Sequence, residues 1–234
     1  METSYEGKDL EAMLFAENYH QWILDQFKPF LGNHVLEVGA GRGDFSVALL
    51  NSEKISGLVA IEPSKEMYPM LERRLKEDSR VIFHQAVFAD MYRKYREYFD
   101  SVIYVNVLEH VENDAQELTY IRESLKEGGR VCIFVPTLPW LYSKFDASVG
   151  HYRRYTKKQL RQLLEQNGFK IEKISYFDIV GIVPWFIFIK LLGGKLGTSN
   201  VLLYDKIIVP LMRRIESVIT APLGKNLIAI GIKK

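Results

Sequence analysis

Short apolar runs alternate with segments of helical periodicity along most of the chain. Branched and aromatic residues fill five of these runs, as they do in buried strands: residues 35–38, 58–61, 81–84, 101–105 and 130–135. Between the runs, apolar residues recur at helical spacing in three segments: residues 45–50, 64–76 and 114–125. We expect the last of these helices to end at Gly128 and Gly129, because glycine readily takes the left-handed conformation that stops a helix.

Helical patterns also flank this alternating region. Apolar and aromatic positions in residues 10–27 predict a helix within an N-terminal helical cap formed by residues 1–30. Further along, Thr156 and Gln159 form a capping box that begins another helix, and Gly168 ends it. Two more apolar runs then predict the sixth and seventh strands: residues 171–177 and 227–232.

Repeated strand–helix units with continuously apolar strands predict an α/β fold. The expected architecture is a doubly wound, mostly parallel seven-stranded sheet with helices on both faces. The chain has no internal repeat, low-complexity tract or Gly/Ser linker, so we expect residues 1–234 to form a single domain. Ligands of such sheets bind beyond the carboxyl ends of the strands, so binding residues should directly follow the strands.

The segment between the sixth and seventh strands is long, and its residues 179–225 predict an apolar helical insertion before the last strand. Residues 179–192 are apolar on every side apart from Lys190. This stretch is too short to span a bilayer, which takes about 20 helical residues. Residues 201–219 alternate apolar with basic residues, as an interfacial or a core-packing helix does. We expect a lid over the ligand site; peripheral membrane contact, homodimerisation and additional core are the alternatives.

The strongest chemical signal is the turn after the first strand, Glu37-Val38-Gly39-Ala40-Gly41-Arg42-Gly43. Glycines there let the backbone turn sharply and approach a ligand closely. Glu62 ends the second strand, where a carboxylate can accept hydrogen bonds from both hydroxyls of a ribose. A nicotinamide dehydrogenase would instead carry G-x-G-x-x-G around a pyrophosphate. Here the third glycine comes one position early, so no phosphate cradle is expected.

The G-x-G-x-G spacing, with an acid two residues before the first glycine, resembles the first motif of class I S-adenosylmethionine-dependent methyltransferases. The resemblance extends over about residues 19–173, and to small bacterial members in particular. It implies a Rossmann-like fold, S-adenosyl-L-methionine as cofactor and methyl transfer as activity. It also implies that Glu62 holds the ribose. The methionine part of the cofactor would lie against the glycine loop, at Glu37, Gly39, Ala40, Gly41 and Gly43.

The same resemblance implies further cofactor contacts. Pro63 and Met67 occupy the turn and helix start where the family often packs an apolar side chain against adenine. Asn106 and Val107 begin the segment after the fourth strand, which lines the cofactor and faces the acceptor. Many members place an acid after the third strand for the adenine amino group. Val87 stands there in this chain, so we expect a backbone contact at or just before Val87 instead.

Two segments are candidates for the acceptor side. His110 follows the fourth strand and is the best-placed general base, because an oxygen or nitrogen acceptor must lose a proton. His151, Arg153 and Tyr155 lie on the loop before the capping box. Their basic groups would hold an anionic group, and the ring would stack on the acceptor or the sulfonium. The alternatives are a packing histidine at His110 and a solvated basic turn at residues 151–155.

No metal site is expected from the sequence. Methyl transfer from a sulfonium is an in-line displacement that can be catalysed largely by alignment of donor and acceptor. The histidines of the chain also show no metal-ligand spacing: His20, His34, His84, His110 and His151.

Charge is distributed unevenly along the chain. Residues 1–150 carry 16 Lys and Arg against 24 Asp and Glu, whereas residues 151–234 carry 15 against 5. A basic C-terminal third attracts anionic small molecules, lipid head groups and nucleic acid alike. We expect a small-molecule or a lipid- or glycan-linked acceptor. An RNA or nucleic-acid methyltransferase and a non-catalytic cofactor-binding module are the alternatives. The nucleic-acid alternative is disfavoured because residues 106–109, Asn-Val-Leu-Glu, differ from the N-P-P-[YFW] tetrapeptide of amino-methylating DNA and RNA enzymes.

Cysteine content and the N-terminal residues bear on the compartment. The single cysteine, Cys132, lies in an apolar run, so the chain cannot build a disulfide framework. The first residues are polar and charged and lack the apolar core of a secretory signal. We therefore expect a cytoplasmic protein, with association to a membrane as the alternative.

Overall fold

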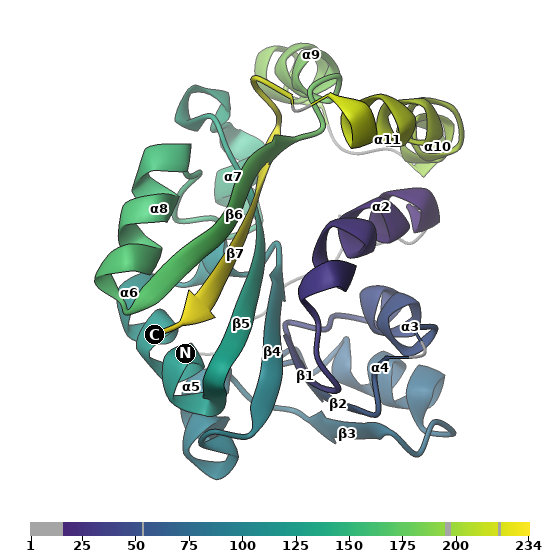
Figure 1. Ribbon diagram of the computed structural model, residues 1–234. Coiled ribbons are helices and arrows are strands. Elements are labelled where there is room, and N and C mark those ends of the chain that lie inside the picture. The colour runs from purple at the N-terminus through teal and green to yellow at the C-terminus, as the bar shows by residue number, and fades with distance from the viewer. Residues whose placement is uncertain (1–15, 53, 195–197, 220) are drawn as a thin grey trace.

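The computed structural model describes residues 16–52, 54–194, 198–219 and 221–234. Among these residues, seven strands form one sheet with the order β3-β2-β1-β4-β5-β7-β6 (Figure 1). In chain order the strands are β1 His34–Val38, β2 Gly57–Ile61, β3 Val81–His84, β4 Phe99–Val105, β5 Leu125–Pro136, β6 Phe169–Phe177 and β7 Asn226–Lys233. Pairing is parallel from β3 through β5, and β7 runs antiparallel to both β5 and β6. The predicted mostly parallel, Rossmann-like sheet is confirmed.

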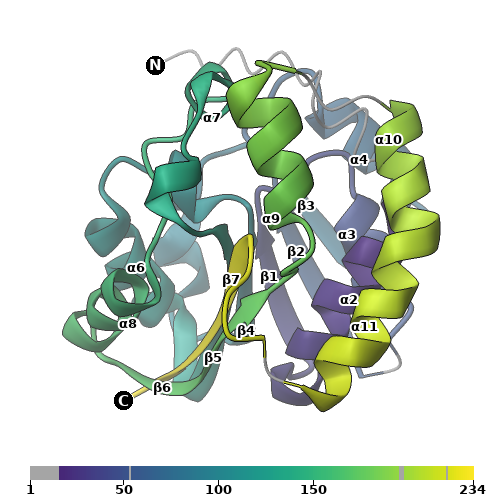
Figure 2. The same cartoon turned by 90° about the horizontal axis from the view of Figure 1, so that it is seen from above.

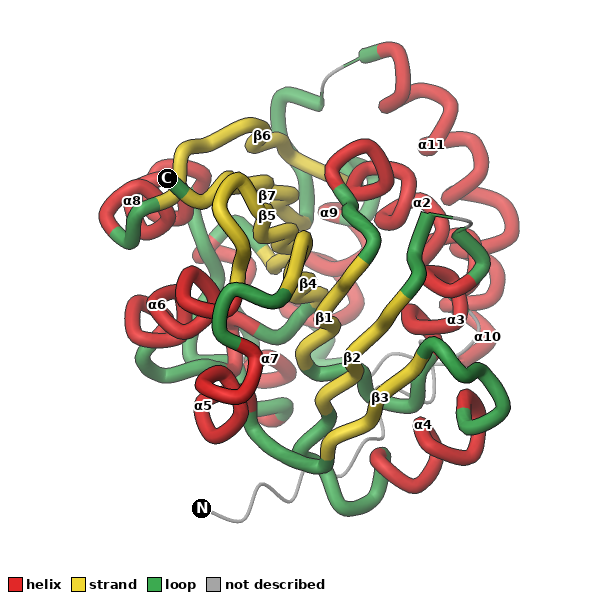
Figure 3. Tube along the Cα trace, turned by 60° about the horizontal axis from the view of Figure 1, so that its bottom comes forward, coloured by secondary structure: helices red, strands yellow, loops and turns green. Residues whose placement is uncertain are grey.

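Helices cover both faces of this sheet (Figure 3). One face carries α2 Glu17–Phe27, α3 Asp44–Leu50 and α4 Tyr68–Leu75. The other face carries α5 Phe88–Met91, α6 Asp114–Ser124 and α8 Lys157–Gln166. Shorter helical segments lie in the connections: η1 Lys28–Phe30, η2 Tyr92–Tyr95, η3 Leu108–His110, η4 Pro139–Leu141 and α7 Lys144–Ser148. Because the strands β1, β2, β4 and β5 are parallel, the loops that follow them meet at one edge of the sheet.

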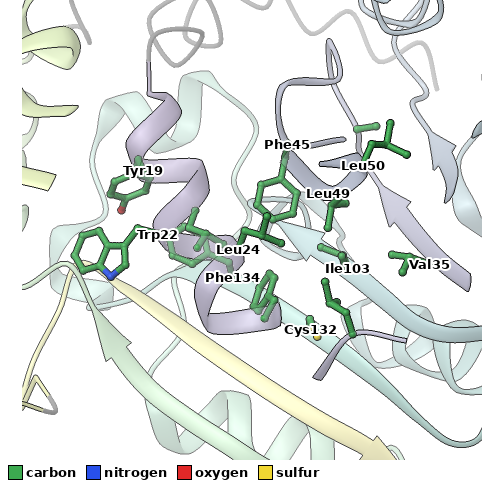
Figure 4. Packing of buried hydrophobic residues seen from close by; sticks show 14 of the residues in the cluster. Tyr19, Trp22, Leu24, Val35, Phe45, Leu49, Leu50, Ile103, Cys132 and Phe134 are labelled. Atoms are coloured by element: carbon green, nitrogen blue, oxygen red, sulfur yellow. The ribbon is translucent and has the colours of Figure 1, made fainter. Parts of the chain in front are cut away.

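Buried apolar side chains form a separate cluster on each face of the sheet. The cluster under α2 and α3 is rich in aromatic rings, and Figure 4 shows Tyr19, Trp22, Phe45 and Phe134 within it. The ring centroids of Trp22 and Phe177 are 3.9 Å apart, which fastens α2 to the end of β6. On the opposite face, α6 and α8 bury leucine and isoleucine side chains against the strands. Burial of these surfaces is the main force that holds the helices to the sheet.

The insertion between β6 and β7 lies at the carboxyl-end edge of the parallel strands (Figure 2). Its first half contains α9 Ile182–Pro184 and the π-helical η5 Trp185–Leu191. Its second half contains α10 Thr198–Leu203, the π-helical η6 Tyr204–Ile208 and α11 Val209–Val218. The second half packs on α2, and Val209 and Met212 are buried in the aromatic cluster beneath it. This half is therefore part of the core. Additional core is one of the alternatives that the sequence leaves open for the insertion.

Two buried carboxylates fix the second half of the insertion in place. Asp178 accepts a hydrogen bond from the hydroxyl of Tyr19 at 3.0 Å and another from the hydroxyl of Tyr204. The ammonium group of Lys225 lies 3.2 Å from the same carboxylate. Asp205 accepts hydrogen bonds from backbone amides at the start of α2. Both carboxylates thus join parts of the chain that are far apart in sequence.

Several boundaries differ from those that the sequence predicts. The helix expected to run to Gly128 ends at Ser124, because Leu125 is fully buried and pairs with Phe99 as the start of β5. The helix expected from residue 64 begins at Tyr68, because Ser64 caps the preceding turn by accepting from the amides of residues 66 and 67. The capping box of Thr156 and Gln159 is confirmed, with reciprocal hydrogen bonds of 3.0 and 3.1 Å.

The sequence predicts an N-terminal helix and no helix that spans a bilayer. The predicted N-terminal helix is present from Glu17 to Phe27, and residues 10–15 lie outside the described residues. Within the described ranges, every helix falls short of the length and apolar character that crossing a bilayer demands.

Candidate active site

The loop after β1 is built from left-handed glycines. The φ angles of Gly39, Gly41 and Gly43 are 69°, 58° and 85°. Residues with a side chain are strained at such angles, so glycine is required for this path of the chain. The amides of Gly39 and Ala40 both donate to the carbonyl of Ile61, at 2.8 and 3.0 Å. These bonds tie the loop to the end of β2.

The space beside these glycines shows where a ligand would fit. A Cβ on Gly39 would lie 2.5 Å from Cγ2 of Val107, and one on Gly43 would lie 3.0 Å from Cδ1 of Leu71. Those two glycines therefore serve close packing within the protein. A Cβ on Gly41 would meet nothing nearer than the sulfur of Met67, at 4.0 Å. Gly41 thus borders open space at the carboxyl ends of β1 and β2.

The carboxylate of Glu62 links the loops after β1 and β2. Its Oε2 accepts from the amide of Gly41 at 2.7 Å, and its Oε1 accepts from the amide of Ser64 at 2.8 Å. Burial raises the pKa of Glu62, and the two backbone hydrogen bonds oppose that rise. Each carboxylate oxygen has a second lone pair, so a pair of ribose hydroxyls can still be accepted. Glu62 therefore lies where the sequence predicts a ribose ligand, directly beside the open space at Gly41.

Glu37 lies buried beneath the glycine loop. Its Oε2 accepts a hydrogen bond from the hydroxyl of Ser46 at 2.5 Å. Burial raises the pKa of Glu37 to about 8; the nearby carboxylates of Glu62 and Asp44 add to the rise, and the hydrogen bond from Ser46 lowers it. A cationic group placed beside Glu37 would favour its ionised form. The amino group of a bound methionine moiety is such a cation.

The other residues predicted on the cofactor side surround this space unevenly. Met67 is buried beside Gly41, and Val107 packs against Gly39. Asn106 has a φ of 52° and donates its amide to the carbonyl of Phe134 at 2.9 Å, so it turns the chain after β4. Pro63 is partly buried in the turn after Glu62. Val87 is 46% exposed in extended backbone directly before α5.

On the acceptor side, the structure brings His110 and His151 together. Their ring centroids are 4.6 Å apart with the planes nearly perpendicular. Burial, with a smaller contribution from the neighbouring His151, lowers the pKa of His110 to about 4, and a hydrogen bond with the backbone of Gly150 opposes the change. His110 is therefore a neutral imidazole near pH 7. It is present in the form that a base requires, although with weak basicity.

The ring of His151 is oriented by a buried carboxylate. Its Nδ1 lies 3.0 Å from Oδ1 of Asp146, which also accepts from Nε of Arg154 at 2.8 Å. A third partner, the amide of Ser143, donates to Oδ2 of Asp146 at 2.9 Å. Burial alone would raise the pKa of Asp146, but the hydrogen bonds and the charge of Arg154 lower it overall. Asp146 is thus an acceptor, and His151 donates to it from Nδ1.

Arg153 and Tyr155 are held by contacts within the protein. The Nη1 of Arg153 and the hydroxyl of Tyr155 both donate to Oδ2 of Asp114, at 2.7 and 2.8 Å. Tyr155 is 3% exposed, so its ring is covered in this structure, and its stacking on an acceptor stays a prediction. Arg153 also donates to the carbonyl of Glu112 at 2.7 Å. Both side chains fasten the loop of residues 151–155 onto the start of α6.

Comparisons with known proteins decide the family. Residues 14–174 match the model of a family described as a methyltransferase domain. The chain belongs to this methyltransferase family. The methyltransferase is also similar to the uncharacterized methyltransferase YdaC of Bacillus subtilis strain 168, at 28% identity over 123 residues, or 52% of this chain and 67% of YdaC.

Solved structures share the fold of this methyltransferase. A SAM-dependent methyltransferase from Archaeoglobus fulgidus matches with a TM-score of 0.63 and 16% identity, over 93% of this chain and 94% of that one. The Burkholderia thailandensis 1,6-didemethyltoxoflavin-N1-methyltransferase, solved with 1,6-didemethyltoxoflavin and S-adenosylhomocysteine bound, matches with a TM-score of 0.64 and 17% identity, over 99% of this chain and 84% of that one. The family and the fold together identify an S-adenosylmethionine-dependent methyltransferase of class I.

The described residues fit the cofactor of this family. S-adenosylmethionine supplies a methyl group activated by a sulfonium, which an acceptor can displace in line. The open space at Gly41 is bordered by Met67 and by the carboxylate of Glu62, and Glu37 lies beneath the loop. These groups would hold an apolar base, a ribose and a cationic amino group respectively. The loop therefore supplies binding and alignment, which is the chief requirement of methyl transfer.

Sequence reasoning missed Glu109 and Asp146. Glu109 lies in η3 directly before His110, and its fully buried side chain faces His151. Asp146 orients His151 from a different loop. The sequence signal for Glu109 is an acid that stands among Val107, Leu108 and Val111, directly before His110. Asp146 offered only the Ser-x-x-Asp spacing from Ser143, which is also an ordinary helix cap.

Proposed function

We propose that this methyltransferase methylates a small-molecule or a lipid- or glycan-linked acceptor that has an apolar part. One observation carries the proposal: the first half of the insertion presents apolar side chains at the edge of the sheet where the cofactor loop lies. Phe188 is 58% exposed there, and Val183 and Leu191 are exposed to a similar degree. Exposed apolar patches of this kind are typical of ligand or membrane contacts.

Aromatic contacts connect this half of the insertion to the segment after β5. The rings of Trp140 and Phe186 have centroids 5.7 Å apart, and those of Phe145 and Trp185 are 5.4 Å apart. The guanidinium of Arg154 lies 4.8 Å from the centroid of Trp185. The insertion therefore touches the same loops that carry His151 and its partner Asp146. We propose that α9 and η5 act as the lid of the acceptor pocket.

The lid function is confined to this first half. The second half is fixed to α2 through Asp205 and is buried at Val209 and Met212. Motion there would break buried hydrogen bonds and expose core surface. The first half buries Ile189 of η5 and otherwise rests on contacts of its aromatic rings, which can separate and re-form at lower cost.

A nucleic-acid acceptor is less consistent with the described contacts. Many basic side chains of the C-terminal third are engaged inside the protein. Arg154 pairs with Asp146, Arg153 with Asp114, and Lys225 with Asp178. The ammonium group of Lys233 is held by the carbonyl of Leu125 at 2.8 Å. The excess of positive charge in the sequence therefore overstates the charge available for phosphate contacts.

A labelled-methyl screen tests the proposal. Purified protein and methyl-labelled S-adenosylmethionine are incubated with separate pools of polar lipids, glycolipids, soluble metabolites and RNA. We expect label in a lipid, glycolipid or amphiphilic metabolite fraction. Label found only in RNA would support the nucleic-acid alternative. Phe188→Glu distinguishes the lid from incidental labelling, because it should reduce transfer without changing cofactor affinity.

A further inference from the structure

Three side chains with metal-binding atoms converge on the acceptor side of the methyltransferase. Glu109 and His110 come from η3 after β4, and His151 comes from the loop before α8. One ligand atom from each, a carboxylate oxygen or an imidazole nitrogen, lies within 4.8 Å of the others. We call these three residues the η3 cluster. Nothing in the family match assigns a role to it.

The carboxylate of Glu109 makes no hydrogen bond among the described residues, and Nε2 of His151 lies 3.9 Å from it. The side chain of Glu109 is fully buried. A buried carboxylate without hydrogen bonds is costly, and native proteins rarely retain one without a reason. The backbone of Glu109 does hold the fold, since its carbonyl accepts from the amide of Tyr152 at 2.8 Å. An apolar residue at position 109 would make the same backbone bond. The backbone bond therefore does not explain the buried carboxylate, whereas a bound ligand would.

A carboxylate holds the imidazole of His151 in the way that is usual for metal-binding histidines. Asp146 accepts a hydrogen bond from Nδ1 at 3.0 Å and is itself held by hydrogen bonds from Arg154 and Ser143. With Nδ1 directed at Asp146, Nε2 is the ring nitrogen on the side of Glu109. This nitrogen lies 3.9 Å from Oε1 of Glu109. A carboxylate that orients the distal nitrogen of a histidine is the common second-layer arrangement around metal-bound imidazole.

His110 is the third residue of the η3 cluster, and its ring contacts that of His151. Its ring is nearly perpendicular to that of His151 and is hydrogen bonded to the backbone of Gly150. A backbone contact of this kind also fixes the orientation of a ligating imidazole. Both histidines therefore have their rings positioned by contacts outside the cluster, and both turn toward the same buried carboxylate.

We propose that Glu109, His110 and His151 bind a divalent transition-metal cation. Two imidazoles and one carboxylate suit Zn²⁺, Fe²⁺ or Co²⁺ better than Mg²⁺ or Ca²⁺, which prefer oxygen ligands. Ligand bonds of about 2.0–2.2 Å at tetrahedral angles place the ligand atoms about 3.3–3.6 Å apart. The ligand atoms now lie within 4.8 Å of one another, so the side chains must close by up to about 1.3 Å on binding. Three protein ligands leave coordination positions open.

The location of the cluster suggests what the cation does. The η3 segment begins directly after Val107, whose side chain packs against Gly39 of the cofactor loop. A cation there would lie between the cofactor loop and the lid, with its open positions available to an oxygen of the acceptor. This role rests on the proposed function, whereas metal binding by the cluster does not. We therefore expect an acceptor with a hydroxyl, phenol or carboxylate group near the methylated atom.

Metal binding can be measured on the intact protein without an acceptor. Chelator-treated protein is titrated with Zn²⁺ by calorimetry and with Co²⁺ by visible absorption, with Mg²⁺ and Ca²⁺ in parallel. We expect one Zn²⁺ or Co²⁺ per chain and a rise in Tm on binding, because a ligand of the folded state stabilises it. Glu109→Gln and His151→Gln should weaken binding at least about 100-fold. The control His34→Gln, at an exposed histidine outside the cluster, should bind as the parent does.

The Tm of each metal-free variant shows whether lost metal binding comes from the lost ligand or from unfolding. Glu109→Gln removes a carboxylate that has no hydrogen-bond partner, so the metal-free variant should keep the Tm of the metal-free parent. Equal metal affinity in Glu109→Gln and the parent would overturn the proposal. So would the absence of binding by all four cations, or a preference for Mg²⁺ or Ca²⁺. A failed acceptor screen with intact metal binding would defeat only the proposed acceptor class.

Discussion

The backbone amide of Tyr19 donates to Oδ1 of Asp205 at 2.9 Å. The two residues come from α2 and from the insertion. The first turn of α2 has no capping side chain of its own, and Ala16 at its N-cap position makes no such bond. Asp205 supplies the missing acceptor and places a negative charge at the positive end of the helix. The insertion therefore completes a helix that belongs to the core.

Replacing Asp205 should destabilise the whole protein. Asp205→Ala leaves the amides of Asn18 and Tyr19 without their acceptor, at a cost of about 1–2 kcal/mol in the free energy of unfolding. Asp205→Asn keeps one acceptor oxygen and should lose less. Urea denaturation at neutral pH measures both. Equal stability of Asp205→Ala and the parent would show that water replaces the cap.

A side chain at Gly41 should block the cofactor. Gly41→Ala places a methyl group in the open space beside Met67, and its φ of 58° adds strain of about 1–2 kcal/mol. Gly128→Ala is the matched control, because Gly128 has a φ of 71°, lies away from the loop, and would leave an added Cβ with no neighbour within 4 Å. Calorimetry with S-adenosylmethionine should show lost affinity in Gly41→Ala alone. A similar loss in both variants would assign the effect to strain.

Removing the Glu62 carboxylate should weaken cofactor binding. Glu62→Ala loses the proposed acceptor of the ribose hydroxyls, which is worth about 1–3 kcal/mol for a charged acceptor. Glu62→Gln keeps an acceptor oxygen but no charge, and should lie between Glu62→Ala and the parent. Binding is measured with S-adenosylhomocysteine as well, which carries the same ribose. Unchanged affinity in Glu62→Ala, with the fold retained, would contradict the assignment.

Glu37 should make stability fall as pH rises. Its folded-state pKa is raised to about 8 from an ordinary 4.5, so between these values the folded protein holds a proton that the unfolded chain has released. The unfolded state then binds fewer protons, and the free energy of unfolding decreases with pH across that window. Glu37→Gln removes this contribution, so its stability relative to the parent should increase by at least about 1 kcal/mol from pH 5 to pH 8. Denaturation curves at several pH values measure the difference, and parallel pH profiles would contradict it.

Charge on the lid should separate activity from stability. Phe188 is exposed on η5, so Phe188→Glu should change the free energy of unfolding by no more than about 0.5 kcal/mol. Methyl transfer to an apolar acceptor should drop, because a charged group would then border its pocket. Ile82→Glu, at an exposed apolar residue of β3, is the control for an added surface charge. Global unfolding of Phe188→Glu would mean that η5 is integral core.

The parts of the site that the sequence predicts well depend on local patterns. The loop at Gly41 and the acid at Glu62 each follow a strand, and parallel strands bring such positions together without further information. The helix start at Thr156 follows from a four-residue capping box. By contrast, the meeting of Glu109 with His151 depends on the path of the loops between them. The burial of Tyr155 depends in the same way on a distant element, because its hydroxyl donates to Asp114 at the start of α6.

The order of the cofactor and acceptor groups along the chain has a practical consequence. The residues assigned to the cofactor lie between Glu37 and Val107, whereas the η3 cluster and the insertion all follow residue 108. The proposed cofactor and acceptor residues therefore occupy consecutive stretches of one polypeptide. A chimera joined after β4 could exchange the second stretch for that of a relative and alter the product while keeping the donor. Such a hybrid needs a relative that also has Phe177 and Asp178, because Trp22 and Tyr19 contact these two residues across the junction.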